Sequence, residues 1–242
     1  MNKRPSDSSF PAFPAMPIDM ARPAAEQIAA ALKSAILNIA LAPGSQISEN
    51  EVGQMFGASR TPVREAFAQL RDEGLLITYP SRGTYISKLS ERKIRGAQFL
   101  REALEVAVVE RLCAEGIAPN DLAALQANIA AQTQAIASDD KAAFQALDDS
   151  FHTRLAAATG YERIGTLLVR EKSALDRLRV LSLHDSKHME TLLSEHSDIV
   201  HALRYGYTGM AMDRMRRHLR GILKTLSVLI EANQNYFEPE KA

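Results

Sequence analysis

Residues 57–67 read GASRTPVREAF and decide the fold of the N-terminal half of the chain. Gly57 allows a tight turn, and Thr61-Pro62 begin a helix because proline is tolerated in the first helical turn. Residues 48–51 (SENE) are a capping box that predicts a short helix ahead of this turn. Two short helices joined by a glycine-containing turn are typical of a helix-turn-helix.

The flanking segments extend this motif to a winged helix-turn-helix over residues 19–88. Upstream, Pro23 begins a helix whose apolar stripe consists of Ile28, Leu32, Ile36 and Ile39. Downstream, short β-prone runs lie on both sides of a turn at residues 80–83, which predicts a two-stranded wing. We therefore expect three helices and a two-stranded wing, preceded by a flexible, proline-rich tail at residues 1–18.

The second helix of the motif has an exposed N-terminal end that carries Arg60, Thr61 and Arg64. This end of a recognition helix meets base edges, and arginine suits guanine because its fork can bond O6 and N7 together. Arg82, at the wing tip, can reach a minor groove or a phosphate. The alternative is that Arg60 and Arg64 are ordinary solvated cations. Residues 19–88 contain seven Lys/Arg and seven Asp/Glu, so attraction to phosphates depends on where the cations lie.

Residues 57–67, together with RGTYI at residues 82–86, resemble the recognition helix and wing of the GntR family of bacterial regulators. The resemblance implies that Arg60 and Arg64 contact bases. It implies contacts to the DNA backbone, or to DNA beside the wing, for Ser59, Thr61, Arg82 and Gly83. The expected partners are a second copy of the chain and double-stranded DNA, in the form of a homodimer on a short inverted repeat.

The chain of 242 residues suits two domains, and its 46% hydrophobic and 24% charged residues are ordinary for a soluble protein. No apolar run reaches the ~18–20 residues of a membrane span, and the single cysteine fits a reducing cytoplasm, where we expect the protein to act. From Leu89 on, helical periodicity predicts helices near residues 91–115, 119–136, 141–159, 162–183, 187–204 and 208–234. The fold class is therefore mainly α, with an all-α bundle at residues 89–242. For this bundle the resemblance to the GntR family implies effector binding and dimerisation.

A carboxylate and three histidines in this half are candidate metal ligands. Asp148 and His152 lie four residues apart on one expected helix, so both reach the same side, while His196 and His218 belong to later helices. Nitrogen and oxygen ligands of this kind suit Zn, Ni, Co or Mn. The alternative is that the histidines are ordinary core residues and that Asp148 and His152 share a local hydrogen bond.

Three further histidines are predicted to lie outside this site. His184 and His188 are also four residues apart, but they straddle an expected helix break and are interpreted as surface or cavity-rim residues. His201 follows His196 by five residues, which turns it away from the same helix face.

Residues 100–105 (LREALE) resemble the opening of the helical domain in the FadR-like branch of the GntR family. The metal-binding members of that branch carry their ligands at places matched by Asp148, His152, His196 and His218. The resemblance implies one divalent ion per chain, zinc first, and an effector carboxylate bound by Arg101. The alternative for Arg101 is a salt bridge to Glu105. Tyr161, where the family usually has asparagine, either alters a helix C-cap or reaches the cavity.

These features predict a DNA-binding transcription regulator whose operator affinity is controlled by a small organic acid bound near a divalent metal. The first alternative is a metal-dependent enzyme acting on such an acid, but the sequence contains no His-Glu-x-x-His motif, Gly-rich phosphate loop or Gly-x-Ser-x-Gly elbow. We therefore expect no enzymatic activity. The second alternative is an architectural DNA binder, which would not need a helical domain larger than the reading domain.

Overall fold

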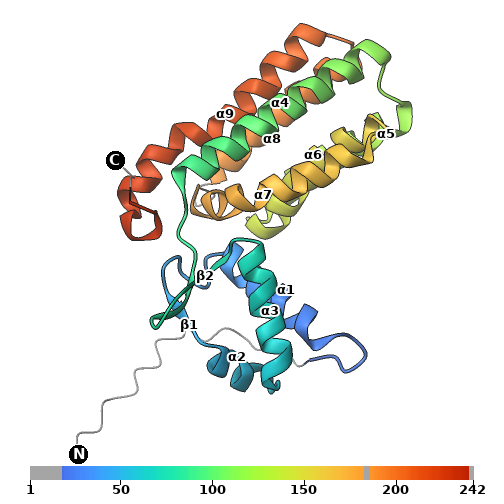
Figure 1. The fold of residues 1–242 in the computed structure, drawn as a ribbon. Helices are drawn as coiled ribbons and strands as arrows, with labels where there is room; N and C mark the ends of the chain where they lie inside the picture. Colours follow the sequence, from blue (N-terminus) through green and yellow to red (C-terminus); the bar gives the residue numbers. More distant parts are fainter. Residues whose placement is uncertain (1–17, 183–185, 240–242) are drawn as a thin grey trace, which may run out of the picture. The chain divides into compact units, whose positions relative to one another are not determined.

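The structure, a computed structural model, describes residues 18–182 and 186–239 (Figure 1). The chain divides into two compact units. One runs to Ser90 and takes in the chain from Asn233 onward, and the other spans Glu91–Ala232. Within the described ranges, no helix is long and apolar enough to cross a membrane.

The N-terminal unit contains the predicted winged helix-turn-helix. Its elements are α1 (Ala24–Leu37), α2 (Glu49–Phe56), α3 (Arg60–Asp72), β2 (Leu76–Tyr79) and β3 (Gly83–Ile86). Gly57 ends α2 with a φ of 61°, a left-handed conformation that glycine adopts without strain. The fully buried core includes Ile28, Leu32, Val52, Phe67 and Leu70. The mainly α fold class, with a winged helix-turn-helix ahead of a helical unit, is confirmed.

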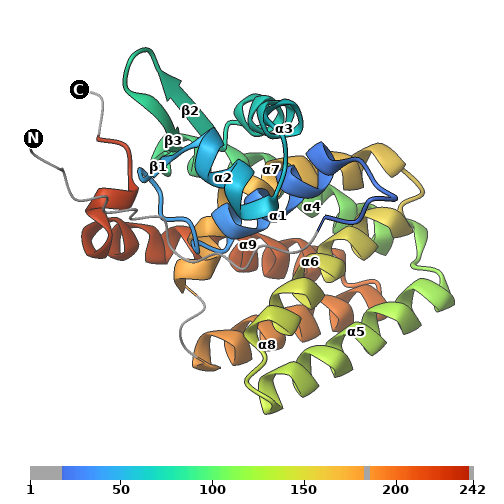
Figure 2. The same cartoon turned by 90° about the horizontal axis from the view of Figure 1, so that it is seen from below.

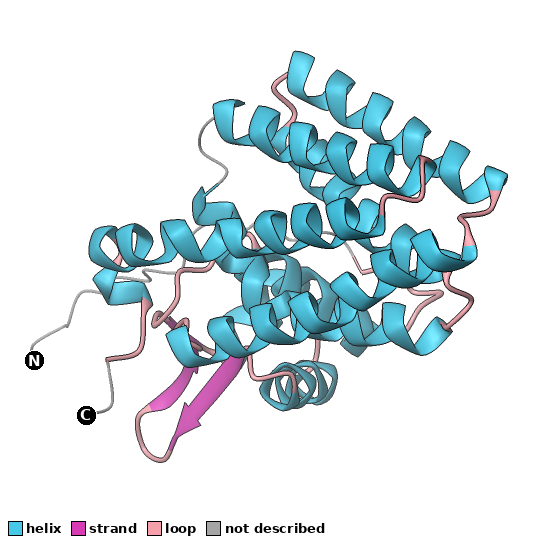
Figure 3. Ribbon diagram, turned by 90° about the horizontal axis from the view of Figure 1, so that it is seen from above, coloured by secondary structure: helices cyan, strands magenta, loops and turns pink. Residues whose placement is uncertain are grey.

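The wing has one strand more than the two that the sequence predicted. Strand β1 (Gln46–Ile47) pairs antiparallel with β3, so the sheet has the order β1-β3-β2. Figure 3 shows the β2–β3 hairpin extending away from the helices of this unit. A strand of two residues is too short to show an alternating pattern, which is why sequence periodicity does not reveal it.

The C-terminal end of the chain belongs to the N-terminal unit, whereas the sequence analysis assigned it to the helical domain at residues 89–242. After a short 3-10 helix at Gln234–Tyr236, the backbone pairs with Leu89: the Leu89 N–H donates to the Tyr236 carbonyl at 2.8 Å, and the Glu238 N–H donates to the Leu89 carbonyl at 2.8 Å. Phe237 is buried there. Such pairing between residues far apart in the chain leaves no local pattern in the sequence.

The described residues of the second unit form six helices, and each helix end lies within two residues of its predicted position. They are α4 (Glu91–Glu115), α5 (Pro119–Ala137), α6 (Lys141–Ala158), α7 (Glu162–Ser182), α8 (Ser186–Arg204) and α9 (Thr208–Ala232). In Figures 1 and 2, α4 and α9 run side by side, and α5 packs against α6 and α8. Asp148, His152, His196 and His218 are buried within this unit.

The N-cap of α2 gives a first testable prediction. The Ser48 hydroxyl accepts a hydrogen bond from the Asn50 N–H at 3.2 Å, whereas Ser59, the N-cap of α3, makes no side-chain capping bond. Ser48→Ala is therefore expected to lower the free energy of unfolding by about 1 kcal/mol. Ser59→Ala is the matched control and should change it by less than about 0.5 kcal/mol. Urea unfolding measures both, and equal losses would contradict the assignment of the cap.

Candidate metal centre, effector cavity and DNA-reading surface

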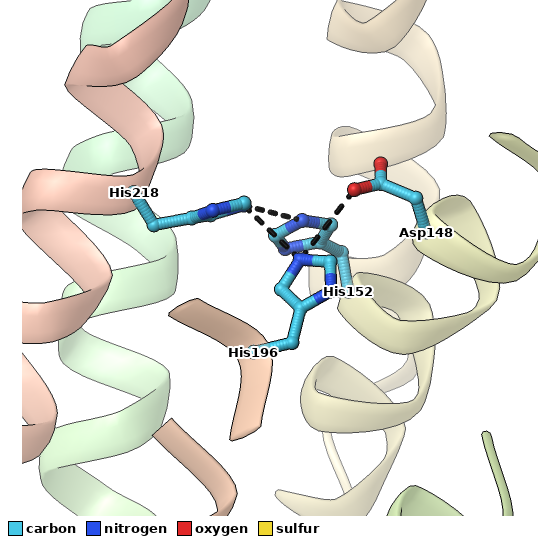
Figure 4. Close-up of side chains that lie close together, drawn as sticks. All are labelled: Asp148, His152, His196 and His218. Carbon is cyan, nitrogen blue, oxygen red and sulfur yellow. Dashed lines mark hydrogen bonds and ion pairs between the residues drawn. The ribbon is translucent and has the colours of Figure 1, made fainter. Parts of the chain in front are cut away.

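The structure brings Asp148, His152, His196 and His218 together inside the helical unit (Figure 4). One donor atom from each lies within 4.8 Å of the others, and all four side chains are buried. Asp148 and His152 are one turn apart on α6, while His196 comes from α8 and His218 from α9. Three helices that are separate in the sequence therefore direct their ligand-type side chains to one point.

The three imidazoles face one another through their Nε2 atoms. His218 Nε2 lies 3.2 Å from His152 Nε2 and 3.3 Å from His196 Nε2. His196 Nε2 also lies 3.4 Å from Asp148 Oδ1. Oδ1 is buried and has no hydrogen-bond partner, which is a costly state for a carboxylate oxygen.

An oxygen atom lies against the other ring nitrogen of each histidine. His152 Nδ1 contacts a Glu105 carboxylate oxygen, His196 Nδ1 lies 2.9 Å from Gln132 Oε1, and His218 Nδ1 lies 2.9 Å from Glu195 Oε2. Because carboxylate and carbonyl oxygens accept hydrogen bonds, the rings carry their protons on Nδ1 and direct Nε2 lone pairs at one another. Burial is the largest influence on His152 and His196 and lowers the pKa of both, which keeps them neutral.

Three lone pairs and one unpartnered carboxylate oxygen fit a divalent cation. Without one, the centre consists of acceptors facing acceptors at 3.2–3.4 Å, an arrangement that no hydrogen bond can satisfy. Imidazole nitrogens held by an oxygen on the far side, with one carboxylate, form the donor set found in protein sites for zinc and similar ions. The residues present therefore fit the group that the sequence predicted.

Arg179, on α7, holds Asp148 in its ionised form. Its Nη2 donates to Asp148 Oδ2 at 2.5 Å, and its Nη1 donates to Asp149 Oδ1 at 2.8 Å. Burial by itself would raise the pKa of the Asp148 carboxyl, but the charge of Arg179 outweighs it and holds that pKa well below its usual range. Asp148 is thus a carboxylate with one oxygen bonded to arginine and the other directed at the histidines.

Arg101 and Glu105, one turn apart on α4, form the salt bridge that the sequence left open as an alternative. Arg101 Nε donates to Glu105 Oε1 at 2.7 Å, and both side chains are buried. The other Glu105 oxygen contacts His152. Burial alone would raise the pKa of the Glu105 carboxyl, but Arg101 and His152 lower it to about 2. Arg101 is therefore joined to a candidate metal ligand through a single carboxylate.

A cavity of about 250 Å³ lies in the helical unit and reaches this cluster. Asp148, His218 and Arg101 all line this cavity. Arg101 therefore borders the cavity even though it forms a salt bridge with Glu105. Apolar side chains cover other parts of its wall: Phe144, Leu175, Leu192, Leu219 and Ile222. The volume suits a small molecule.

His188, His201 and Tyr161, which the sequence also singled out, lie outside the candidate metal cluster. His188 lines the cavity, His184 lies outside the described residues, and His201 is exposed with its ring beside Tyr205. Tyr161 is 51% exposed, and the Arg111 guanidinium lies over its ring at 4.7 Å. Tyr161 is thus a surface residue at the start of α7 and is not among the residues that line the cavity.

Sequence patterns do not reveal the residues that orient the ligands. Glu105 has the spacing of a partner for Arg101, but no pattern assigns a role to Gln132, Glu195 or Arg179. Glu195 precedes His196 in the sequence, yet it contacts His218 on another helix. No short-range spacing signals such contacts, because each joins two different helices.

The residues predicted to read DNA are exposed on the N-terminal unit. Ser59 caps α3, and Arg60, Thr61 and Arg64 follow in its first turns, all exposed. Val63, Ala66 and Phe67 on the opposite face are buried, so the helix separates an apolar core face from a polar outer face. The free N–H groups of the first turn add a positive partial charge at this end.

The wing tip holds Arg82 and Gly83 in a tight turn between β2 and β3. The Arg82 N–H donates to the Tyr79 carbonyl at 3.1 Å, and the Tyr85 hydroxyl donates to the Arg82 carbonyl at 3.0 Å. Gly83 has a φ of +99°, and a Cβ added there would lie 2.6 Å from Gln46 Nε2. The Gln46 side chain can move aside, so it is the positive φ that favours glycine here. The Arg82 side chain remains exposed beside it.

Comparisons with known proteins agree with this architecture. The model for bacterial regulatory proteins of the gntR family matches residues 24–86, and the model for the FCD domain matches residues 98–221. The HTH-type transcriptional repressor RspR of Escherichia coli (strain K12) is 34% identical over 220 residues, which cover 90% of this chain and 96% of the relative. An HTH-type transcriptional regulator from an unstable DNA locus of Streptomyces ambofaciens is 33% identical over 211 residues, covering 87% and 88%.

Solved structures share the fold at lower identity. Escherichia coli McbR/YncC has a TM-score of 0.68 at 18% identity, and a GntR transcriptional regulator from Rhodococcus sp. RHA1 has a TM-score of 0.69 at 22% identity. Each comparison covers 86% of this chain and 98% of the other. With both halves matched by family models and relatives above 30% identity along most of its length, the chain belongs to the GntR family of bacterial transcription regulators and carries an FCD domain.

Proposed function

We propose that this DNA-binding regulator responds to a small organic acid that binds beside a divalent metal ion in its helical unit. One observation carries the proposal: a single cavity of about 250 Å³ is bordered both by the candidate metal cluster, through Asp148 and His218, and by Arg101. A carboxylate is the ligand group that a metal ion and a guanidinium can bind at once.

Asp148, His152, His196 and His218 would hold one ion per chain, with zinc expected first and nickel, cobalt or manganese as alternatives. The ion would supply a positive charge in the cavity and, where it accepts six donors, room for two oxygens of the acid. Arg101 would bind the acid with the guanidinium nitrogens that Glu105 does not use, since only its Nε is bonded to that carboxylate. The cavity volume favours an acid of few carbon atoms.

The effector would act by binding one arrangement of the protein more tightly than another. A typical coupling of this kind is ~1–3 kcal/mol, or about 5–150-fold in operator affinity. We infer a homodimer on a short inverted repeat, with the change transmitted through the connection at residues 88–90. The relative RspR is a repressor, which favours repression that the effector relieves.

An effector screen tests the proposal. Small organic acids would be screened by thermal shift on wild type, metal-stripped protein and Arg101→Lys, followed by operator titration with each hit. The lysine keeps a cation beside Glu105 but loses the guanidinium fork. We expect hits to stabilise wild type alone and to change operator affinity by about 5–150-fold. Arg111→Lys, at a partly exposed position on the same helix that does not line the cavity, should behave like wild type. A hit that stabilises all forms equally would place the pocket elsewhere.

The reading helix gives a second prediction. Arg60→Ala or Arg64→Ala should each weaken operator binding by ~1–3 kcal/mol and relax base preference at one position per half-site. Arg82→Ala should weaken binding more evenly across sequences, because it is proposed to meet the backbone. Arg71→Ala, exposed at the far end of α3, is the matched control. Quantitative footprinting measures these effects. An unchanged footprint at wild-type affinity in the Arg60/Arg64 double variant would refute the assignment.

A further inference from the structure

Two amide side chains on α5 form a buried chain of hydrogen bonds that ends at His196. Gln132 is 0% exposed and Asn128 is 5% exposed. Asn128 Nδ2 donates to the Leu147 carbonyl at 3.1 Å, and Gln132 Nε2 donates to Asn128 Oδ1 at 2.7 Å. Gln132 Oε1 lies 2.9 Å from His196 Nδ1. Helix α5 supplies none of the four candidate ligands, yet it contacts one of them through this chain.

The direction of these hydrogen bonds follows from their first member. The Leu147 carbonyl can only accept, so Asn128 must present its NH₂ group to it and its oxygen to Gln132. Gln132 then presents its NH₂ group to Asn128 and its oxygen to His196. The reverse order would place two oxygens against each other at Leu147 and leave buried groups unpaired, which costs about 1–3 kcal/mol for each group. His196 therefore carries its proton on Nδ1.

We propose that Asn128 and Gln132 are positioning residues of the metal centre and that they select the His196 tautomer with a free Nε2 lone pair. If the Gln132 amide were reversed, the proton of His196 would lie on Nε2, directed at His218 Nε2 and Asp148 Oδ1. That tautomer has no lone pair on the atom that faces the other ligands. The inference rests on the metal site proposed above. It adds two residues to that site that are not metal ligands themselves.

The other two histidines are oriented differently, which gives Gln132 a specific role. His152 and His218 face the carboxylates of Glu105 and Glu195, whose two oxygens both accept hydrogen bonds, so either orientation serves. An amide has one accepting and one donating end, so Gln132 orients His196 correctly only when Asn128 holds it. This series of hydrogen bonds starts at the carbonyl of Leu147, the residue before Asp148. It therefore links the ligand-bearing part of α6 to the ligand on α8.

Two substitutions of Gln132 test the role of the Asn128–Gln132–His196 hydrogen bonds, called the relay below. They have different expected results. Gln132→Met fills a similar volume but cannot accept a hydrogen bond, whereas Gln132→Glu retains an acceptor for His196. In full-length protein, competition with a zinc chelator should show a 10–100-fold loss of zinc affinity for Gln132→Met and a smaller loss for Gln132→Glu. Gln134→Met, exposed on the same helix, is the control. If Gln132 only packed against its neighbours, the loss of zinc affinity would be larger for Gln132→Glu than for Gln132→Met, because glutamate would bury a charge while methionine would fit.

Imidazole ¹⁵N spectra of metal-free protein separate this inference from the metal proposal. With six histidines in the chain, His196 can be assigned by comparison with a His196 variant. Wild type should show the Nδ1–H tautomer, and Gln132→Met should show a mixture. An Nε2–H tautomer in wild type would overturn the relay whatever the metal content. If wild type binds no zinc but shows Nδ1–H, the metal proposal fails while the relay is supported.

Discussion

Replacing His196 with alanine is expected to abolish binding of the divalent ion and to lower the melting temperature by roughly 8–16 °C. An ion that binds only the assembled helices, at about 1,000 times its dissociation constant, contributes ~4.1 kcal/mol to the folded state. His196 is fully buried, and its Nε2 atom faces both His218 and Asp148. Metal analysis of the purified protein and thermal unfolding with excess zinc measure the two effects.

His201→Ala is the matched control, because His201 lies on the same helix but is exposed. It should retain one ion per chain and the wild-type melting temperature. Chelation should lower the melting temperature of wild type and leave that of His196→Ala unchanged, which separates loss of the ion from loss of packing. A full ion content in His196→Ala would refute the ligand set.

Glu105→Gln is expected to lower the free energy of unfolding of metal-free protein by about 3–5 kcal/mol. Arg101 is only 6% exposed and loses its charged partner in this variant, and an uncompensated buried charge costs that much. His152 also loses the carboxylate that orients it. Urea unfolding at neutral pH measures the loss.

A second pair on α4 provides the control. Arg111 and Glu115 have the same spacing and lie 2.8 Å apart, but their side chains are 39% and 58% exposed. Glu115→Gln should therefore change stability by less than about 1 kcal/mol. The pKa of Glu105 is lowered from 4.5 to about 2 in the folded protein, so its contribution is complete above pH 4.5 and is lost as the pH falls toward 2. Wild type and Glu105→Gln should converge over that range, and equal stability at neutral pH would contradict the prediction.

The contacts around the candidate metal centre involve all of the helices α4–α9 of the helical unit. Ligands come from α6, α8 and α9, and the residues that orient them add α4 through Glu105, α5 through Gln132 and α7 through Arg179. An ion bound there would therefore stabilise the packing of the whole unit. The effector proposed above would reach the same network through the cavity beside this centre, which would be a physical route by which a small acid changes the arrangement of the helices.

The sequence by itself determined the secondary structure and the type of protein. Helix ends could be predicted within two residues because caps, prolines, glycines and apolar periodicity act over a few residues. The helix at Arg60–Asp72 could be predicted because its apolar residues, such as Val63 and Phe67, follow helical spacing, but resemblance to the GntR family was needed to interpret it as a recognition helix. Strand β1 and the pairing of Leu89 with Phe237 were missed, since both depend on residues that are distant in the chain.

Only the tertiary structure decided how the candidate site is built. Spacing placed Asp148 and His152 on one side of a helix, but resemblance to a family was needed to add His196 and His218. The orienting contacts of the three histidines join residues that are 47, 64 and 23 positions apart. Such contacts depend on how helices cross and on which side chains meet inside the bundle, and one residue's spacing to the next carries no information about them. Their consequence, three imidazole nitrogens and one carboxylate oxygen within 4.8 Å of one another, is a property of the folded unit alone.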